Sequence, residues 1–97
     1  MKSIKIKTFI ACQTECWGYY NKDSWLMYHR EDGPAATYKD GSKYWWRHNK
    51  LHREDGPAIE HPNGSNTGVL YLWYYHGERI DVSSQEDFER WLKYNKF

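Results

Sequence analysis

The 97-residue sequence lacks three features that would define its class at once: it has only two cysteines, no long apolar run and no large excess of either charge. Small secreted domains usually depend on several disulfides, and a membrane-spanning helix needs about 20 apolar residues, so we expect neither class. The lysine-containing N-terminus has no apolar segment of the kind that a signal peptide requires. These absences predict a soluble, cytoplasmic protein that makes no membrane contact.

The two cysteines, Cys12 and Cys16, lie four residues apart. At this spacing they could form a disulfide, provide two metal ligands or remain free thiols. We favour free, partly buried thiols, because an isolated cysteine behaves as a small apolar residue.

The charges are balanced, with 14 lysines and arginines against 13 aspartates and glutamates and a net charge of +1. A protein that grips long nucleic acids usually carries a basic excess, so strong nucleic-acid binding is not expected. The sequence also shows no nucleophile beside a base, no glycine-rich phosphate loop and no isolated carboxylate pair. We therefore predict a protein that is not an enzyme and needs no cofactor.

Aromatic residues, in contrast, are abundant: six Trp, nine Tyr and three Phe. Each large ring removes about 150–250 Å² from water when it is buried, so these rings are expected to supply most of the core. A chain of this length forms one core, which predicts a single domain over residues 1–97.

An internal repeat organises the middle of the chain. The seven residues His-Arg-Glu-Asp-Gly-Pro-Ala occur at His29–Ala35 and again at His52–Ala58, 23 residues later. A repeat of this length indicates stacked units that bury their apolar faces against one another. Function is therefore expected on a repeated surface.

Each copy is followed by a hairpin signal, Asp40-Gly41 in the first and Asn63-Gly64 in the second. Glycine in these pairs tolerates the positive φ that tight hairpin turns require. The aromatic strands that follow are 28 residues apart, which places five additional residues near Ser65–Gly68. This longer tip is a candidate contact loop.

The sequence thus predicts a mainly β fold (β+α): an antiparallel sheet of successive β-hairpins with one C-terminal helix. Residues 1–26 are expected to form an N-terminal strand, Ser3–Ile10, and a cap or degenerate copy of the repeat. The hairpin repeats occupy 27–80 and include a central strand at Val69–Tyr75. Serines ahead of acidic residues predict a capped helix over 83–95 that packs on the sheet.

The seven-residue corner admits two interpretations. In the structural one, charge-assisted bonds between arginine and aspartate hold a bend between hairpins. This assigns a structural role to Arg30, Asp32, Gly33, Pro34, Arg53, Asp55, Gly56 and Pro57. In the functional one, His29, Glu31, His52 and Glu54 form a ladder that faces a ligand, with equivalent strands about 10 Å apart. The same four residues include zinc-ligand types, but their spacing does not indicate a metal site, so none is predicted.

Aromatic and basic residues alternate in two further segments. These provide the other candidate binding residues: Trp45, Trp46, Arg47, His48, Trp73, Tyr75, His76 and Arg79. Alternation along a strand places Trp45 and Trp46 on opposite faces, so we expect one in the core and the other exposed. Exposed rings in a row indicate a protein-binding patch, and rings beside arginine can also stack on a nucleotide base.

The segment Trp46–Ala58 resembles the variant MORN-type repeat, in which an aromatic strand and a turn lead into a Lys-Leu-His-Arg step and a Gly-Pro-Ala bend. A second unit begins at Trp73 and passes into the helix. The resemblance covers about residues 28–80 and implies an array of antiparallel hairpins that serves as a binding scaffold without shared catalytic residues. Small versions with this motif look like bacterial and phage proteins, which suggests by analogy an anti-CRISPR or other anti-defence factor.

Taken together, the sequence favours a non-enzymatic protein-binding module that inhibits a host protein in the bacterial cytoplasm by occlusion. Two alternatives remain: a sponge that sequesters a small signalling nucleotide, and a structural protein that assembles with itself. A monomer and a dimer are both compatible with the sequence.

Overall fold

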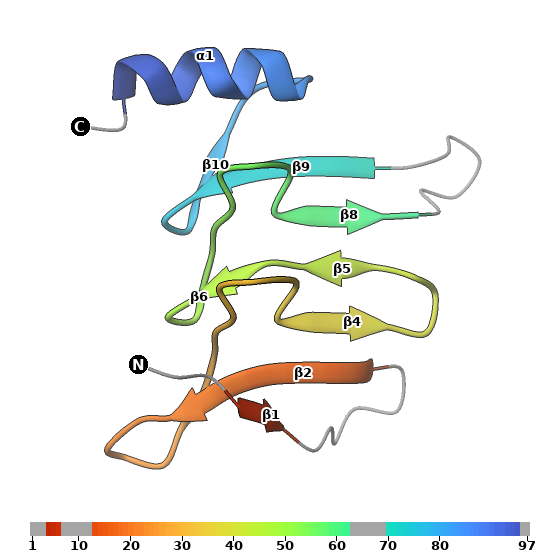
Figure 1. Ribbon diagram of the computed structural model, residues 1–97, viewed down its shortest axis with the longest axis vertical. Helices are drawn as coiled ribbons and strands as arrows, with labels where there is room; N and C mark the ends of the chain where they lie inside the picture. The colour runs from red at the N-terminus through yellow and green to blue at the C-terminus, as the bar shows by residue number, and fades with distance from the viewer. Residues whose placement is uncertain (1–3, 7–12, 63–69, 96–97) are drawn as a thin grey trace.

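The computed structural model describes residues 4–6, 13–62 and 70–95. The chain is a flat stack of hairpins that measures 38 × 37 × 19 Å. The N-terminal strands lie at one end of the stack and the helix lies at the other (Figure 1).

Within the described residues, eight strands form one sheet and two short strands form a separate hairpin. The strands are β1 (Ile4–Ile6), β2 (Gln13–Tyr20), β3 (Leu26–Tyr28), β4 (Ala36–Tyr38), β5 (Lys43–Tyr44), β6 (Trp46–Arg47), β7 (Lys50–Leu51), β8 (Ile59–His61), β9 (Leu70–Tyr75) and β10 (Glu78–Ile80), and the helix is α1 (Gln85–Asn95). The sheet order is β1-β2-β4-β5-β8-β9-β10, β3 also pairs with β2, and every pairing is antiparallel. The predicted fold class is therefore confirmed.

Three equivalent hairpins start at Trp17, Trp45 and Trp73, which are 28 residues apart in each step. These hairpins are β2–β3, β6–β7 and β9–β10, and their tips lie along one side of the stack (Figure 1). The segment predicted as a cap or degenerate copy is thus a hairpin of the array. Its tip is five residues longer than that of the β6–β7 hairpin, as the distances from Trp17 to His29 and from Trp45 to His52 show.

The corner after each of the first two hairpins rests on the next hairpin. The amide of Arg30 donates to the carbonyl of Trp46 at 3.1 Å, and that of Arg53 donates to Tyr74 at 3.3 Å. Each corner therefore satisfies a backbone carbonyl of the following unit.

Two apolar clusters hold the stack. At the helical end, Phe88 and Leu92 pack on Trp73 and Ile80. Toward the N-terminus, Ile6, Cys16 and Ala36 form the second cluster, surrounded by partly buried aromatic rings. Ala35, Ala36 and Ala58 are also almost completely buried, and their small side chains allow neighbouring strands to lie close together.

The helix begins as the serines predict, because the amide of Asp87 donates to Oγ of Ser84 at 3.2 Å. Helix α1 is predicted over 83–95 and spans Gln85–Asn95. In the described part of the chain, no helix has the length and apolar character needed to cross a membrane.

The other local predictions have mixed outcomes. The Asp40-Gly41 turn joins β4 and β5, and β9 is a central strand between β8 and β10. Asn63-Gly64 and Ser65–Gly68 lie outside the described residues. In β1, Ile6 is buried, but Ile4 is 55 % exposed although the alternation assigns both to one face. Cys16 is a free, buried thiol, so it forms no disulfide; Cys12 lies outside the described residues.

Candidate functional site

The arginine of the second corner is enclosed by its own unit. The guanidinium of Arg53 lies 3.7 Å from the ring centroid of Trp45. Its Nε donates to Asp55 at 2.9 Å, and one terminal nitrogen donates to the carbonyl of Pro57 at 3.1 Å and to Glu60 at 2.8 Å. Arg53 thus closes the bend as the structural interpretation predicts.

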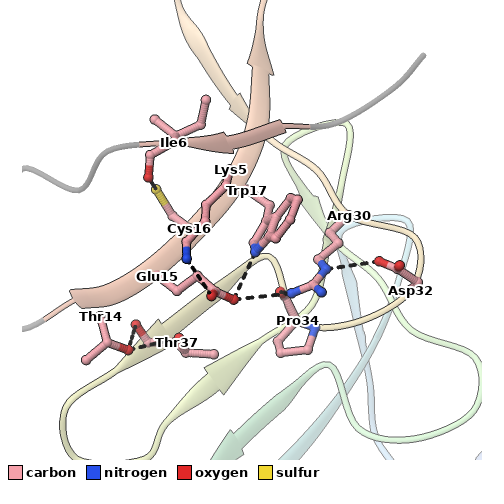
Figure 2. Close-up of polar contacts among 10 residues, drawn as sticks. All are labelled: Lys5, Ile6, Thr14, Glu15, Cys16, Trp17, Arg30, Asp32, Pro34 and Thr37. Atoms are coloured by element: carbon pink, nitrogen blue, oxygen red, sulfur yellow. Dashed lines mark hydrogen bonds and ion pairs between the residues drawn. The ribbon is translucent and has the colours of Figure 1, made fainter.

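Arg30 repeats this arrangement in the first corner (Figure 2). It lies 4.2 Å from the ring centroid of Trp17 and donates to Asp32 at 3.0 Å, to the carbonyl of Pro34 at 3.3 Å and to Glu15 at 3.3 Å. The indole of Trp17 also donates to Glu15 at 2.9 Å. This bond is the main reason why the pKa of Glu15 lies below its ordinary value, and the nearby charges of Lys5 and Arg30 act in the same direction.

In each unit, a tryptophan ring and a carboxylate enclose the arginine, and we call this arrangement the arginine bracket. The carboxylate comes from a different strand in each unit. Glu15 faces Thr37 across β2 and β4, whereas Glu60 faces Lys43 across β8 and β5. A carboxylate therefore contacts the arginine in both units, but it occupies different positions in the two copies of the repeat. Sequence analysis missed Glu15 and Glu60 for this reason. It also missed Trp17, although the 28-residue spacing of Trp17, Trp45 and Trp73 was a usable signal.

The repeated glycine lets each arginine lie flat on the bend. A Cβ at Gly56 would be 2.5 Å from Cζ of Arg53, and one at Gly33 would be 3.2 Å from Cζ of Arg30. The first distance is impossible without movement and the second is merely tight. The glycine of the motif thus leaves room for the arginine, and a Cβ is excluded more strictly at Gly56 than at Gly33.

The two repeat histidines are internal links. His29 and His52 are only 1 % and 3 % exposed. Nδ1 of His29 accepts the amide of His48 at 2.9 Å, and Nδ1 of His52 accepts the amide of His76 at the same distance. Both imidazoles are therefore used inside the fold, where each holds the next hairpin tip. His29 does not face solvent as the ladder prediction requires, whereas His52 also lines the cleft described below.

These bonds determine the tautomer of each ring. Nδ1 must be unprotonated to accept an amide, which leaves the proton on Nε2. Nε2 of His29 lies 3.3 Å from Glu31, and Nε2 of His52 lies 3.4 Å from Glu54. Burial lowers the pKa of both histidines despite these carboxylates.

A cleft of about 550 Å³ lies between the two corners. It is lined by Glu31, Asp32, Gly33, Trp45, Arg47, His52, Arg53, Glu54 and Asp55. The two copies of the motif contribute four carboxylates, of which Asp32, Asp55 and Glu31 are 86 %, 87 % and 65 % exposed at the side chain. The side chain of Arg47 makes no hydrogen bond or ion pair with any residue that the structure describes.

The predicted aromatic and basic residues are dispersed. Trp45 is half-buried under Arg53, and Trp46 is half-buried against Tyr28, with ring centroids 5.5 Å apart. The expectation that one of these tryptophans is core and the other exposed is wrong, because arginine covers one and tyrosine covers the other. Both remain in partial contact with water.

In the third unit, Trp73 is buried and donates to Gln85 of the helix at 2.8 Å. Tyr75 is half-buried and packs on Trp91, with centroids 5.5 Å apart. His48, His76 and Arg79 are exposed. The exposed large aromatic side chains in the described segments are Tyr20, Trp25, Tyr71 and Tyr94, which alternation did not identify because each lies at a strand end, a hairpin tip or the helix surface.

Within residues 4–6, 13–62 and 70–95, no three or more His, Cys, Asp or Glu side chains are placed so that they could hold a metal ion. Comparison with family models, curated proteins and solved structures finds no match. The resemblance to MORN-type repeats therefore stays a prediction, and functional conclusions depend on the geometry alone.

Proposed function

We propose that this protein is a non-enzymatic binding module that holds a basic segment of a partner protein in the cleft between its two corners. The observation that carries this proposal is the convergence of four carboxylates, Glu31, Asp32, Glu54 and Asp55, around one cleft of about 550 Å³. Lysine and arginine side chains complement such a surface.

The arginines of the corners neutralise only part of this acidity, although Arg53 pairs with Asp55 at 2.9 Å and Arg30 with Asp32 at 3.0 Å. Arg53 is packed against Trp45 and bonded to Glu60 and the carbonyl of Pro57, and Arg30 is bonded in the same way within its own unit. The side chains of Asp32, Asp55 and Glu31 nevertheless remain largely exposed to solvent. These carboxylates would repel the phosphate groups of a nucleotide, which disfavours the sponge alternative at this cleft.

The repeat also suggests a spacing for the partner. The corners precede β4 and β8, and β5 lies between those strands, so we expect equivalent backbone positions of the two corners to be about 10 Å apart. In a polyproline II segment, residues three apart lie on the same side and are separated by about 9.3 Å. A partner with lysine or arginine at every third position would present one cation to each corner.

Arg47 adds a specific element, because it lies in the cleft without a partner among the described residues. Its guanidinium is available to a carbonyl or carboxylate of the bound segment, which favours a peptide over a simple polycation. A host protein bound here would have its basic segment covered, and this is how occlusion would inhibit it. The phage setting is suggested only by the repeat resemblance.

Binding can be tested with ¹⁵N-labelled protein and a peptide of about three Lys-Pro-Pro repeats, with a Glu-Pro-Pro peptide as control. We expect amide shifts around the two corners with the basic peptide only, and weaker binding at high salt. The Glu31→Gln/Glu54→Gln double variant should bind at least about tenfold more weakly. Its matched control is Glu78→Gln/Glu86→Gln, which removes two exposed carboxylates that do not line the cleft.

Equal shifts with both peptides, or equal affinity of the two double variants, would contradict the proposal. Amide shifts confined to the region around Tyr71 and Arg79 would instead place the binding site on β9 and β10, away from the two corners.

A further inference from the structure

We propose that the cleft is acid-sensitive: protonation of His29 and His52 releases the hairpin tips that these rings hold and thereby disassembles the cleft. This inference concerns the regulation of the site in the proposed function and rests on it for its biological meaning. The structural transition itself can be measured without any partner.

Each ring accepts a hydrogen bond that it can accept only while Nδ1 is unprotonated. Nδ1 of His29 takes the amide of His48, and Nδ1 of His52 takes the amide of His76, both at 2.9 Å. A protonated imidazole carries N–H on both nitrogens and accepts nothing. Each ring is almost fully buried, so a protonated ring could not turn away to water without opening the corner.

The amides that the two rings hold lie in turns with positive φ. His48 and Asn49 have φ of 49° and 63°, and His76 and Gly77 have φ of 50° and 86°. Positive φ is uncommon in residues other than glycine and carries a conformational cost. These turns therefore already contain strained residues, and loss of the bond to the buried histidine would remove an interaction that holds them in place.

The groups around His29 act in opposite directions. Tyr19 and His48 flank the ring, with centroids 5.7 Å and 4.3 Å away, and Arg47 lies close enough to repel a positive charge. Glu31 lies 3.3 Å from Nε2 and favours protonation, but its side chain is 65 % exposed. Burial outweighs this pair, and the pKa of His29 lies below its ordinary value.

His52 has the same surroundings one repeat later. Tyr75 and His76 flank it at 4.9 Å and 4.3 Å between centroids, Arg47 again opposes a positive charge, and Glu54 lies 3.4 Å from Nε2. Burial is the largest cause of its lowered pKa, followed by the charge of His76. Because the charge of Arg47 opposes protonation of both rings, the two protonation events are coupled through one residue of the cleft.

The direction of the effect follows from the lowered pKa of both rings. The open form binds a proton more readily than the closed form, so the closed form is fully favoured above the ordinary histidine pKa of about 6.5. Its advantage is lost as the pH falls from that value toward the lowered pKa of the closed state. We therefore expect the cleft to be assembled at neutral pH and to open in mild acid.

The test is amide hydrogen exchange of His48 and His76 at about pH 7.5 and about pH 5.5, corrected for the intrinsic pH dependence of exchange. We expect protection of both amides to fall by about tenfold or more at the lower pH. The His29→Asn/His52→Asn variant keeps an acceptor near the Nδ1 position but cannot titrate, so its protection should change little. The His61→Asn variant, which alters a histidine outside the corners, should behave as the wild type.

Protection that does not change in the wild-type protein, or that falls equally in the double Asn variant, would overturn the proposal. If the double variant does not fold, ring titrations of His29 and His52 by NMR decide the question in the wild type, since values at or above about 6.5 refute it. Failure of the Lys-Pro-Pro peptide to bind at neutral pH would refute the proposed function but would leave these exchange results unaffected.

Discussion

Replacement of Gly56 by alanine tests the arginine bracket most directly. The new Cβ would lie 2.5 Å from Cζ of Arg53, 2.8 Å from its Nη1 and 2.9 Å from its Nε. The guanidinium would have to leave its place, and the contact with Trp45, worth about 0.5–2 kcal/mol, would be lost. The charge-assisted bonds to Glu60 and Pro57 would be lost as well, and such bonds contribute about 1.5–3 kcal/mol each at most.

Two effects reduce this sum. Arg53 can form new bonds with water once it is displaced, and alanine restricts the unfolded chain, which stabilises by about 0.4–1 kcal/mol where the backbone permits it. We expect Gly56→Ala to lower the free energy of unfolding by about 2–3 kcal/mol. Gly33→Ala should cost about 1 kcal/mol or less, because its Cβ would be 3.2 Å from Cζ of Arg30 and a small shift relieves it.

Urea unfolding followed by tryptophan fluorescence gives these free energies. The decisive control is a double-mutant cycle with Arg53→Ala. Once the guanidinium is absent, Gly56→Ala should be neutral or slightly stabilising. If Gly56→Ala costs the same in both backgrounds, the glycine is required for another reason and the packing argument is wrong.

Two further predictions concern the two apolar clusters. Phe88→Ala should lower the free energy of unfolding by about 3–5 kcal/mol in urea, because the ring is completely buried between the helix and the sheet; a cost below about 1 kcal/mol would mean that the helix is not firmly docked. In a Cys12→Ser variant, the thiol of Cys16 should react slowly with a thiol reagent at mildly alkaline pH until urea is added, since burial raises its pKa. A rapid reaction of the native protein would show that this cluster is open to solvent.

The sequence predicted those parts of the fold that depend on local chemistry. The Asp40-Gly41 pair specifies a hairpin within a few residues, and Ser84 begins a helix through a bond to Asp87. The bond between Arg53 and Asp55 is also local, since the two residues are close in the sequence. In each case, the interaction that fixes the structure is contained in the motif that signals it.

The candidate site could be predicted only in part, because its geometry depends on contacts between units. His29 accepts an amide from residue 48, and histidine is ordinarily only partly buried, so nothing near it in the sequence indicates an internal link. The carboxylate beside each arginine comes from β2 in one unit and from β8 in the next. The exposed ring of Trp25 lies in the longer first hairpin, where the repeat offers no second copy for comparison.

The third unit explains why the described residues contain one such cleft although they contain three equivalent hairpins. Ile80 follows Trp73 at the distance that separates His52 from Trp45, and it is buried against the helix rather than linked to a further tip. Gln85 accepts the indole proton of Trp73 and donates to the carbonyl of Glu54 at 3.4 Å. The start of the helix therefore occupies the place of a third corner and satisfies groups that another repeat would cover. Because the helix caps the array in this way, the carboxylates of the two repeat copies line a common cleft only between the two corners. The binding and acid-sensitivity experiments therefore both address that cleft.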